Sequence, residues 1–238
     1  MRRSTSAWRA GWSVTLLSVA LAMHGPAPAA ALPAEAYAID AERSLFAVLT
    51  HKAGIGSGLA HDHLVVAPRP TVELRFDPAQ PEATSFRFTV AAEGLEIDAP
   101  AARAAWKGRF RELGMHSGEL PPVGDSDRRK VRTAMLGASQ LDAEKFPEIR
   151  AEVAGLVRRA AAPAAGWNVR LRLTIRGRTV ERELPATWSA VGGDLSAEVV
   201  GAFLFSEFGI EPYSTMFGAI RNDDRFHLFV SVVARRAP

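Results

Sequence analysis

The sequence predicts an all-β fold, an antiparallel sheet that closes into a barrel or packs as a sandwich, with one helical and loop insertion. Apolar and polar residues alternate along most of the chain, which is typical of strands with one face toward water. About eight or nine such segments follow one another, and an open sheet of that size would leave its edges unpaired. The 238 residues contain no cysteine, so the fold depends on a packed core rather than on disulfides.

Residues 1–31 have the features of a cleaved secretory signal peptide. Arg2, Arg3 and Arg9 precede a mostly apolar run over 12–23, and the three alanines at 29–31 satisfy the A-x-A cleavage pattern. The apolar run is shorter than the roughly 20 residues of a membrane span, which favours cleavage over a retained anchor. We therefore expect a periplasmic or secreted mature domain at 32–238.

The charge of the mature domain gives no indication of a nucleic-acid partner. The chain carries 29 basic and 26 acidic side chains, and the three arginines of the predicted signal account for the difference. Without that segment the charges balance, and no basic block remains. A mature chain of about 207 residues fits one domain with its own core.

The clearest strand is WNVRLRLTIR, residues 167–176, in which Leu171, Leu173 and Ile175 share one face and arginines occupy the other. Gly177 follows and supplies the positive φ that a tight hairpin requires before the next strand. The other strands are predicted at 37–40 with 44–50, 71–76, 84–97, 148–157, 179–188, 195–205 and 225–235.

The period of two breaks between residues 101 and 147, which are richer in helix formers and loop residues. Helical segments are predicted at 101–113, at 128–139 and at 141–147, the last stopped by Pro147. This region is either a cap over one end of the barrel or a surface excursion. Neither a phosphate-binding loop nor a nucleophile elbow occurs, so no catalytic constellation is predicted and a binding protein is favoured over an enzyme.

Several stretches resemble the YceI-like family of periplasmic lipid-binding proteins, in the family's order along nearly all of the mature chain. The most specific is the hairpin LRLTIRGRTV. The stretches are YAIDAERSLFAVLTHKAG, ATSFRFTVAAEGLEID, SQLDAEKFPEIRAEV, LRLTIRGRTVERELPATW and FLFSEFGI. The segment between Pro100 and Asp127 is longer than the family pattern, and the helix before the lysine-aromatic-proline element is altered to RRKVRTAMLGASQLD.

The resemblance implies an extended lipocalin-like β-barrel that holds a long isoprenoid, a quinone-like molecule or another amphiphilic lipid, with no required cofactor. Candidates for the ligand-binding wall are Phe86, Phe88, Leu171, Leu173, Ile175, Phe203, Phe205 and Phe208. The alternative is that these side chains fill a closed core. We expect residues 101–116 to form the lid, and Lys107, Arg109 and Arg111 offer a transient contact with an anionic membrane surface.

The stretch GLAHDHLVVA contains His61 and His63 on either side of Asp62. On a straight strand the two histidines would project from the same face, a spacing that can also serve a zinc ion. A third ligand would have to come from His51, His116, His227 or Asp62 itself. Three interpretations stay open: a structural polar cluster, a contact with the ligand headgroup, and a metal-binding protein or metal-dependent enzyme.

Overall fold

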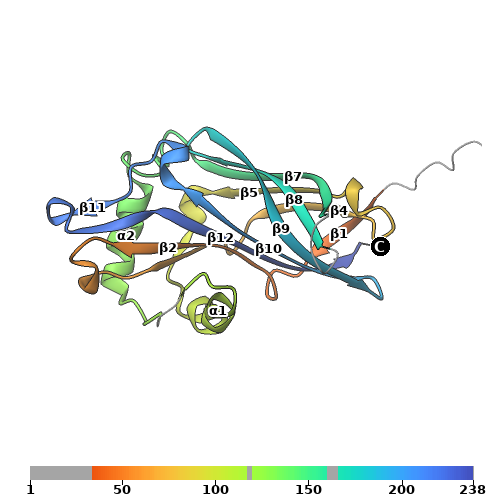
Figure 1. Cartoon of the computed structure of the whole chain (residues 1–238), viewed down its shortest axis with the longest axis horizontal. Helices are drawn as coiled ribbons and strands as arrows, with labels where there is room; N and C mark the ends of the chain where they lie inside the picture. The colour runs from red at the N-terminus through yellow and green to blue at the C-terminus, as the bar shows by residue number, and fades with distance from the viewer. Residues whose placement is uncertain (1–33, 117–119, 160–165, 238) are drawn as a thin grey trace, which may run out of the picture. The chain divides into compact units, whose positions relative to one another are not determined.

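The computed structural model describes residues 34–116, 120–159 and 166–237, in which eight antiparallel strands close into a lipocalin-like barrel. β1 closes the ring, because it pairs with β4 on one side and with the end of β12 on the other (Figure 1). The order around the barrel is β1 (Glu35–Ile39), β4 (Thr71–Phe76), β5 (Ser85–Ala91), β7 (Glu148–Arg159), β8 (Gly166–Ile175), β9 (Arg178–Val191), β10 (Asp194–Leu204) and β12 (Ile220–Arg236). The all-β prediction is confirmed in its barrel form. The predicted signal peptide lies outside the described residues.

Further strands extend the sheet from the long strand β12. Its 17 residues are more than β1 can cover, and eight of them pair with β2 (Leu45–Ala53). From β2 the sheet continues to β3 (His63–Val66) and β6 (Glu96–Ile97), while β11 (Ser214–Thr215) forms a short hairpin with the start of β12. The single strand predicted at 84–97 is therefore wrong: a turn at 92–94 ends β5, and β6 pairs with β3 instead.

The hairpin of β8 and β9 matches its sequence pattern. Ile175 pairs with Arg178, and the two residues between them take positive φ values, 50° at Arg176 and 70° at Gly177. Such a pair of left-handed residues is the two-residue turn that fits the twist of antiparallel strands. Leu171 and Leu173 are buried in the main core as predicted.

Helix α1 (Pro100–Glu112) packs on the outside of the barrel wall. It begins with a proline, whose fixed φ and missing N–H suit the first helical turn. The rings of Trp106 and Phe110 contact Phe229 of β12 at centroid distances of 5.4 and 5.3 Å. These side chains belong to a second apolar cluster with Leu49 and other outward residues of β2 and β3, so α1 covers the outer face of this sheet.

Helix α2 (Asp125–Leu136) lies at one end of the barrel, the end from which β11 projects (Figure 1). Its presence confirms a helix in the region predicted at 128–139. The helix predicted at 141–147 is wrong. Those residues form turns with Asp142 at a positive φ of 51°, and the Asp142 carbonyl accepts hydrogen bonds from the amides of Lys145 and Phe146. Among the described residues, no helix combines the length and the apolarity that a bilayer span requires.

Candidate functional site: the barrel cavity and its polar end

The barrel encloses a cavity of about 290 Å³ beneath α2. Most of its wall is aliphatic or aromatic, because the inward faces of the strands carry the apolar half of each alternating pattern. From the predicted set, the wall includes Phe86, Phe88, Leu171, Leu173, Ile175, Phe205 and His63. The volume is close to the lower end of the roughly 300–1,000 Å³ that small-molecule sites occupy.

Two of the predicted wall residues lie in the core instead of on the cavity. Phe203 and Phe208 are fully buried and pack against Phe226, with ring centroids 5.9 and 6.1 Å away. Neither borders the cavity, whereas Phe205, next to them in sequence, does. The turn at 205–208 interrupts the strand alternation, which explains why a period of two did not separate these three aromatic residues.

A second, smaller cavity of about 90 Å³ lies deeper in the barrel. Its wall contains no charged residue and includes Phe76, Trp188 and Val232. The two cavities have four lining side chains in common: Phe86, Leu171, Leu228 and Val230. A chain that extends from the first cavity into the second would have to pass between them.

Helix α2 closes the larger cavity with one face. Val131, Ala134 and Met135 line it, and Lys130 reaches its edge. The prediction that residues 101–116 form the lid is therefore wrong, because α1 packs on the outer face and borders neither barrel cavity. Arg109 of α1 is held by Glu198 of β10, with Nε 3.0 Å from a carboxylate oxygen, rather than left free for a headgroup.

The polar side chains of the larger cavity gather toward the same end as α2. Thr50 lies near the end of β2, His63 begins β3, and Asn222 lies near the start of β12. Lys130, Gln140 and Tyr213 complete this polar set. The cavity therefore has an apolar interior and a polar end, the distribution that an amphiphile with one headgroup requires.

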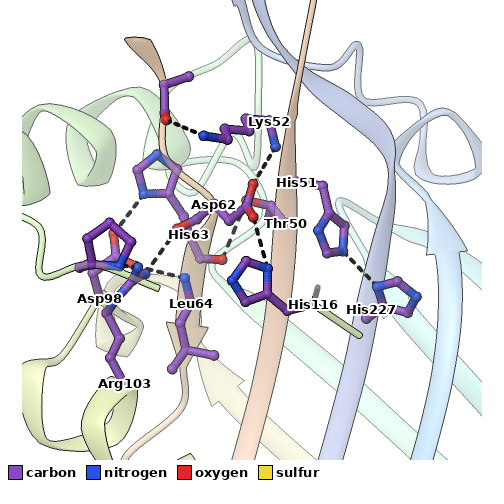
Figure 2. A network of polar contacts seen from close by, with 12 residues as sticks. Thr50, His51, Lys52, Asp62, His63, Leu64, Asp98, Arg103, His116 and His227 are labelled. Carbon is purple, nitrogen blue, oxygen red and sulfur yellow. Dashed lines mark hydrogen bonds and ion pairs between the residues drawn. The ribbon is translucent and has the colours of Figure 1, made fainter. Parts of the chain in front are cut away.

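His63 is held by a buried ionic network (Figure 2). Its Nδ1 lies 2.7 Å from Oδ2 of Asp98, a carboxylate with no exposed surface. The other oxygen of Asp98 accepts from the amide of Leu64 at 2.8 Å and is paired with the guanidinium of Arg103. Asp98 lies between β6 and α1 at a positive φ of 49°, a conformation that aspartate tolerates better than most residues.

This network fixes what His63 can offer a ligand. The Asp98 carboxylate accepts from Nδ1, which favours the tautomer with the proton on Nδ1 and with Nε2 as an acceptor. An acceptor at the polar end of an apolar cavity suits a hydroxyl donor. Asp98 and Arg103 were not predicted from the sequence, because their partners lie on β3 and in the loop at Pro121.

The three residues of the HDH element line two different cavities: His63 borders the barrel cavity, and His61 and Asp62 border another. β3 begins at His63, so His61 precedes the strand and the expected shared face does not exist. His61 lines an open polar cavity of about 530 Å³ on the outside of the sheet, together with Asp62, His51, His116 and His227. Asp62 accepts a hydrogen bond from the amide of Lys52 at 2.8 Å and lies 3.3 Å from Nδ1 of His116.

Within residues 34–116, 120–159 and 166–237, no three acidic or histidine side chains converge as metal ligands. The rings of His61 and His63 are 6.4 Å apart between centroids, and Nδ1 of His63 faces Asp98. The metal interpretation of the HDH element is therefore not favoured. The polar-cluster interpretation describes His63, whose ring contacts the Asp98 carboxylate, and the headgroup interpretation stays a prediction for His63, which lines the barrel cavity.

His51 and His227 form a pair on the outer face, with Nε2 of the first 2.7 Å from Nδ1 of the second (Figure 2). Desolvation lowers the pKa of both imidazoles below the ordinary 6.5. Asp62 and Asp223 oppose this shift at His51, while His116 and Arg225 add to it. The pair is thus kept neutral, one ring donating the hydrogen bond and the other accepting it.

Stability should accordingly fall in mild acid. A histidine whose folded-state pKa is depressed binds its proton more readily in the unfolded chain. Its contribution to the free energy of unfolding is therefore fully present above pH 6.5 and is lost as the pH falls below that value. We expect the free energy of unfolding, measured in urea between about pH 8 and pH 5, to decrease toward acid. In a His51→Gln, His227→Gln variant the decrease should be smaller. His61→Gln, which removes an exposed histidine, is the control that should keep the wild-type slope.

Comparison with known families identifies the family to which this barrel belongs. The family model described as the YceI-like domain matches residues 37–234. The chain belongs to the YceI-like family. The match covers all eight barrel strands at least in part, together with α1 and α2, so the cavity and its helical lid are parts of one family domain. No match is found among curated proteins.

Solved structures resemble this YceI-like chain in fold. BcnA from Burkholderia cenocepacia aligns with a TM-score of 0.56 at 16% identity, over 82% of this chain and 99% of that one. The YCEI protein of Campylobacter jejuni aligns with a TM-score of 0.50 at 13% identity, over 73% and 85%. A polyisoprenoid binding domain from Saccharophagus degradans aligns with a TM-score of 0.46 at 7% identity, over 86% and 99%.

Proposed function

We propose that the protein is a periplasmic or secreted carrier that holds an isoprenoid or similar long-chain amphiphile inside its barrel. One observation carries the proposal: the cavity is apolar along its length and polar at the end beneath α2. Membership of the YceI-like family supports a binding role rather than catalysis. The basic and apolar pattern of residues 1–31 supports export.

The apolar wall would supply most of the affinity. Each methylene group transferred from water to such a wall contributes about 0.8 kcal/mol, so an isoprenoid tail needs few polar contacts. The wall residues proposed to hold the tail are Phe86, Phe88, Leu171, Leu173, Ile175 and Phe205. With the tail among them, the headgroup would meet the polar end.

The polar end would select the headgroup. A hydroxyl or phenol could donate to Nε2 of His63, whose orientation Asp98 fixes. Lys130 lies at the edge of the same cavity and would accommodate an acceptor or an anionic group. An alcohol, a phenol or a quinol at the end of an isoprenoid chain matches this arrangement.

The proposal predicts that protein purified from its own host retains a ligand. Native mass spectrometry should show an adduct of several hundred daltons that survives chelation and is released by organic solvent. A His63→Phe variant should lose affinity for hydroxyl-headed chains by about two- to tenfold, since a hydrogen bond in such a site contributes roughly 0.5–1.5 kcal/mol. His61→Phe, on the outer face, is the matched control.

Two results would count against this function. Repeated bare masses from native-host material would indicate a closed core without a ligand. An adduct that disappears on chelation would support a bound metal ion instead of a lipid. N-terminal sequencing of the same preparation would test whether cleavage follows residue 31.

A further inference from the structure

Two loop tips at the α2 end of the barrel expose large apolar side chains. Ile55 and Leu59, in the loop between β2 and β3, are 99% and 78% exposed. Met216 and Phe217, in the turn between β11 and β12, are 61% and fully exposed. Figure 1 shows both tips at the end where α2 lies. Large apolar side chains gathered in this way mark an interaction surface.

Both tips project from residues that line the barrel cavity. Thr50 and His63 flank the first loop, and Tyr213 and Asn222 flank the second; all four border the cavity. The amide of Asn222 donates to the carbonyl of Tyr213 at 2.9 Å and closes the base of the second hairpin. Whatever these tips contact is therefore brought to the polar end of the cavity.

The two tips are fastened to each other. The amide of Gly56 donates to the carbonyl of Ala219 at 2.9 Å. Gly54 lies against the same carbonyl at a φ of 92°, where any side chain would collide with it. The apolar side chains therefore stand on one joined platform rather than on two independent loops.

The backbone of the second tip is strained. Met216 and Phe217 occupy the left-handed region, with φ of 50° and 54°, which bulky residues rarely adopt. No apolar packing compensates at Phe217, because its side chain is in water. Strain that is maintained without an internal contact indicates a contact with something outside the chain.

Two cations stand directly behind the apolar side chains. Arg221 pairs in register with Ser214 of β11 and with Ala53 of β2, and Lys52 pairs with Asn222. Both side chains are exposed, and neither forms an ion pair with an acidic side chain in the part of the chain that the structure describes. The Lys52 ammonium donates to the carbonyl of Ala60 at 3.3 Å, within the first loop. Apolar tips backed by exposed cations and by Tyr213 reproduce the layering of a membrane interface, with acyl chains first and headgroups behind.

We infer that these two tips dock the protein on an anionic lipid bilayer, with Ile55, Leu59, Met216 and Phe217 inserted among the acyl chains and Lys52 and Arg221 at the headgroups. A protein partner fits less well, since a stable interface buries about 800 Å² on each side, whereas these side chains project separately from narrow hairpins. The docking extends the proposed function, because it would set the polar end of the cavity against the membrane that supplies the ligand. This docking surface differs from the contact through Lys107, Arg109 and Arg111 of α1 that the sequence suggested, which stays a prediction.

The test is co-sedimentation of the full purified protein with vesicles of phosphatidylethanolamine and phosphatidylglycerol. The variant is Met216→Asn, Phe217→Asn, because asparagine suits the left-handed region and should leave the stability unchanged or higher. We expect the partition coefficient to fall by about tenfold or more. The control is Val191→Asn: this side chain is 75% exposed in the hairpin of β9 and β10, where Asp194 pairs with Arg235 at the opposite end of β12. It should partition like the wild type.

Wild-type protein that stays in the supernatant at every lipid concentration would overturn the docking, as would equal losses in both variants. Loss of self-association in the asparagine variant, with no change in vesicle binding, would also overturn it and assign the tips to a second copy of the chain. Ligand content is measured on the same samples by native mass spectrometry. A bare wild type that still binds vesicles would refute the proposed carrier function while leaving the docking intact.

Discussion

Replacing Arg103 with methionine is expected to lower the free energy of unfolding by about 3–5 kcal/mol, because it leaves the Asp98 carboxylate buried without its cation. Arg103 is 3% exposed, and besides Asp98 it donates to the carbonyls of Asp62 at 3.0 Å and Pro121 at 2.8 Å. One guanidinium thus joins the start of α1, the HDH element and the loop that follows α1. A domain's total stability is only about 5–15 kcal/mol, so the loss approaches the unfolding threshold.

Urea denaturation would measure this loss, with two further variants for comparison. Asp98→Asn, Arg103→Met removes both charges and should recover about 2 kcal/mol of the single variant's loss, since breaking a buried pair costs more than removing it. Arg87→Met breaks the exposed pair with Glu73, at 3.3 Å, and should cost at most about 1 kcal/mol. A loss for Arg103→Met no greater than that for Arg87→Met would show that the network does not stabilise the fold.

Replacing Leu171 with tryptophan should weaken the binding of a long isoprenoid by roughly a hundredfold. Leu171 is one of the four side chains shared by the two barrel cavities, so a larger ring there is expected to obstruct a chain that extends from the first cavity into the second. If roughly four methylene groups lose their place in the deeper cavity, about 3 kcal/mol of binding free energy is lost. A short chain that fills only the first cavity should be affected far less.

The comparison is a titration with farnesol and with solanesol, followed by native mass spectrometry. Arg172→Trp places the same ring on the outward face of β8 and is the control. Its affinities should match the wild type for both ligands. Equal losses for the short and the long alcohol would show that the first cavity has collapsed, and no loss for the long one would show that its chain does not extend into the second cavity.

The sequence predicted the barrel well where local pattern and tertiary contact agree. In β8, every second residue from Val169 to Ile175 is buried, as strict alternation requires. Gly177 forms the turn predicted for it. The pattern failed at turns that interrupt a strand, at 92–94 and at 205–208, because a single turn residue shifts which side chains face inward.

The candidate site was predicted only in part. The apolar wall followed from alternation, and six of the eight predicted apolar residues border the larger cavity. The position of the lid could not be predicted from the sequence, because α1 and α2 carry similar mixtures of basic and apolar residues. Only their packing shows which of the two helices covers the opening. Asp98 and Arg103 gave no local signal, since their partners are distant in sequence.

By itself, the sequence determined the family, the all-β class and the inward faces of the long strands, because these depend on the side-chain period of each segment and on motifs within it. The tertiary structure decided the rest. It placed α2 over the cavity and α1 outside, set His61 and His63 on different cavities, and brought Asp98 and Arg103 together beside His63. These features arise from contacts between segments far apart in the chain, and burial makes such contacts strong without leaving a periodic trace in the sequence.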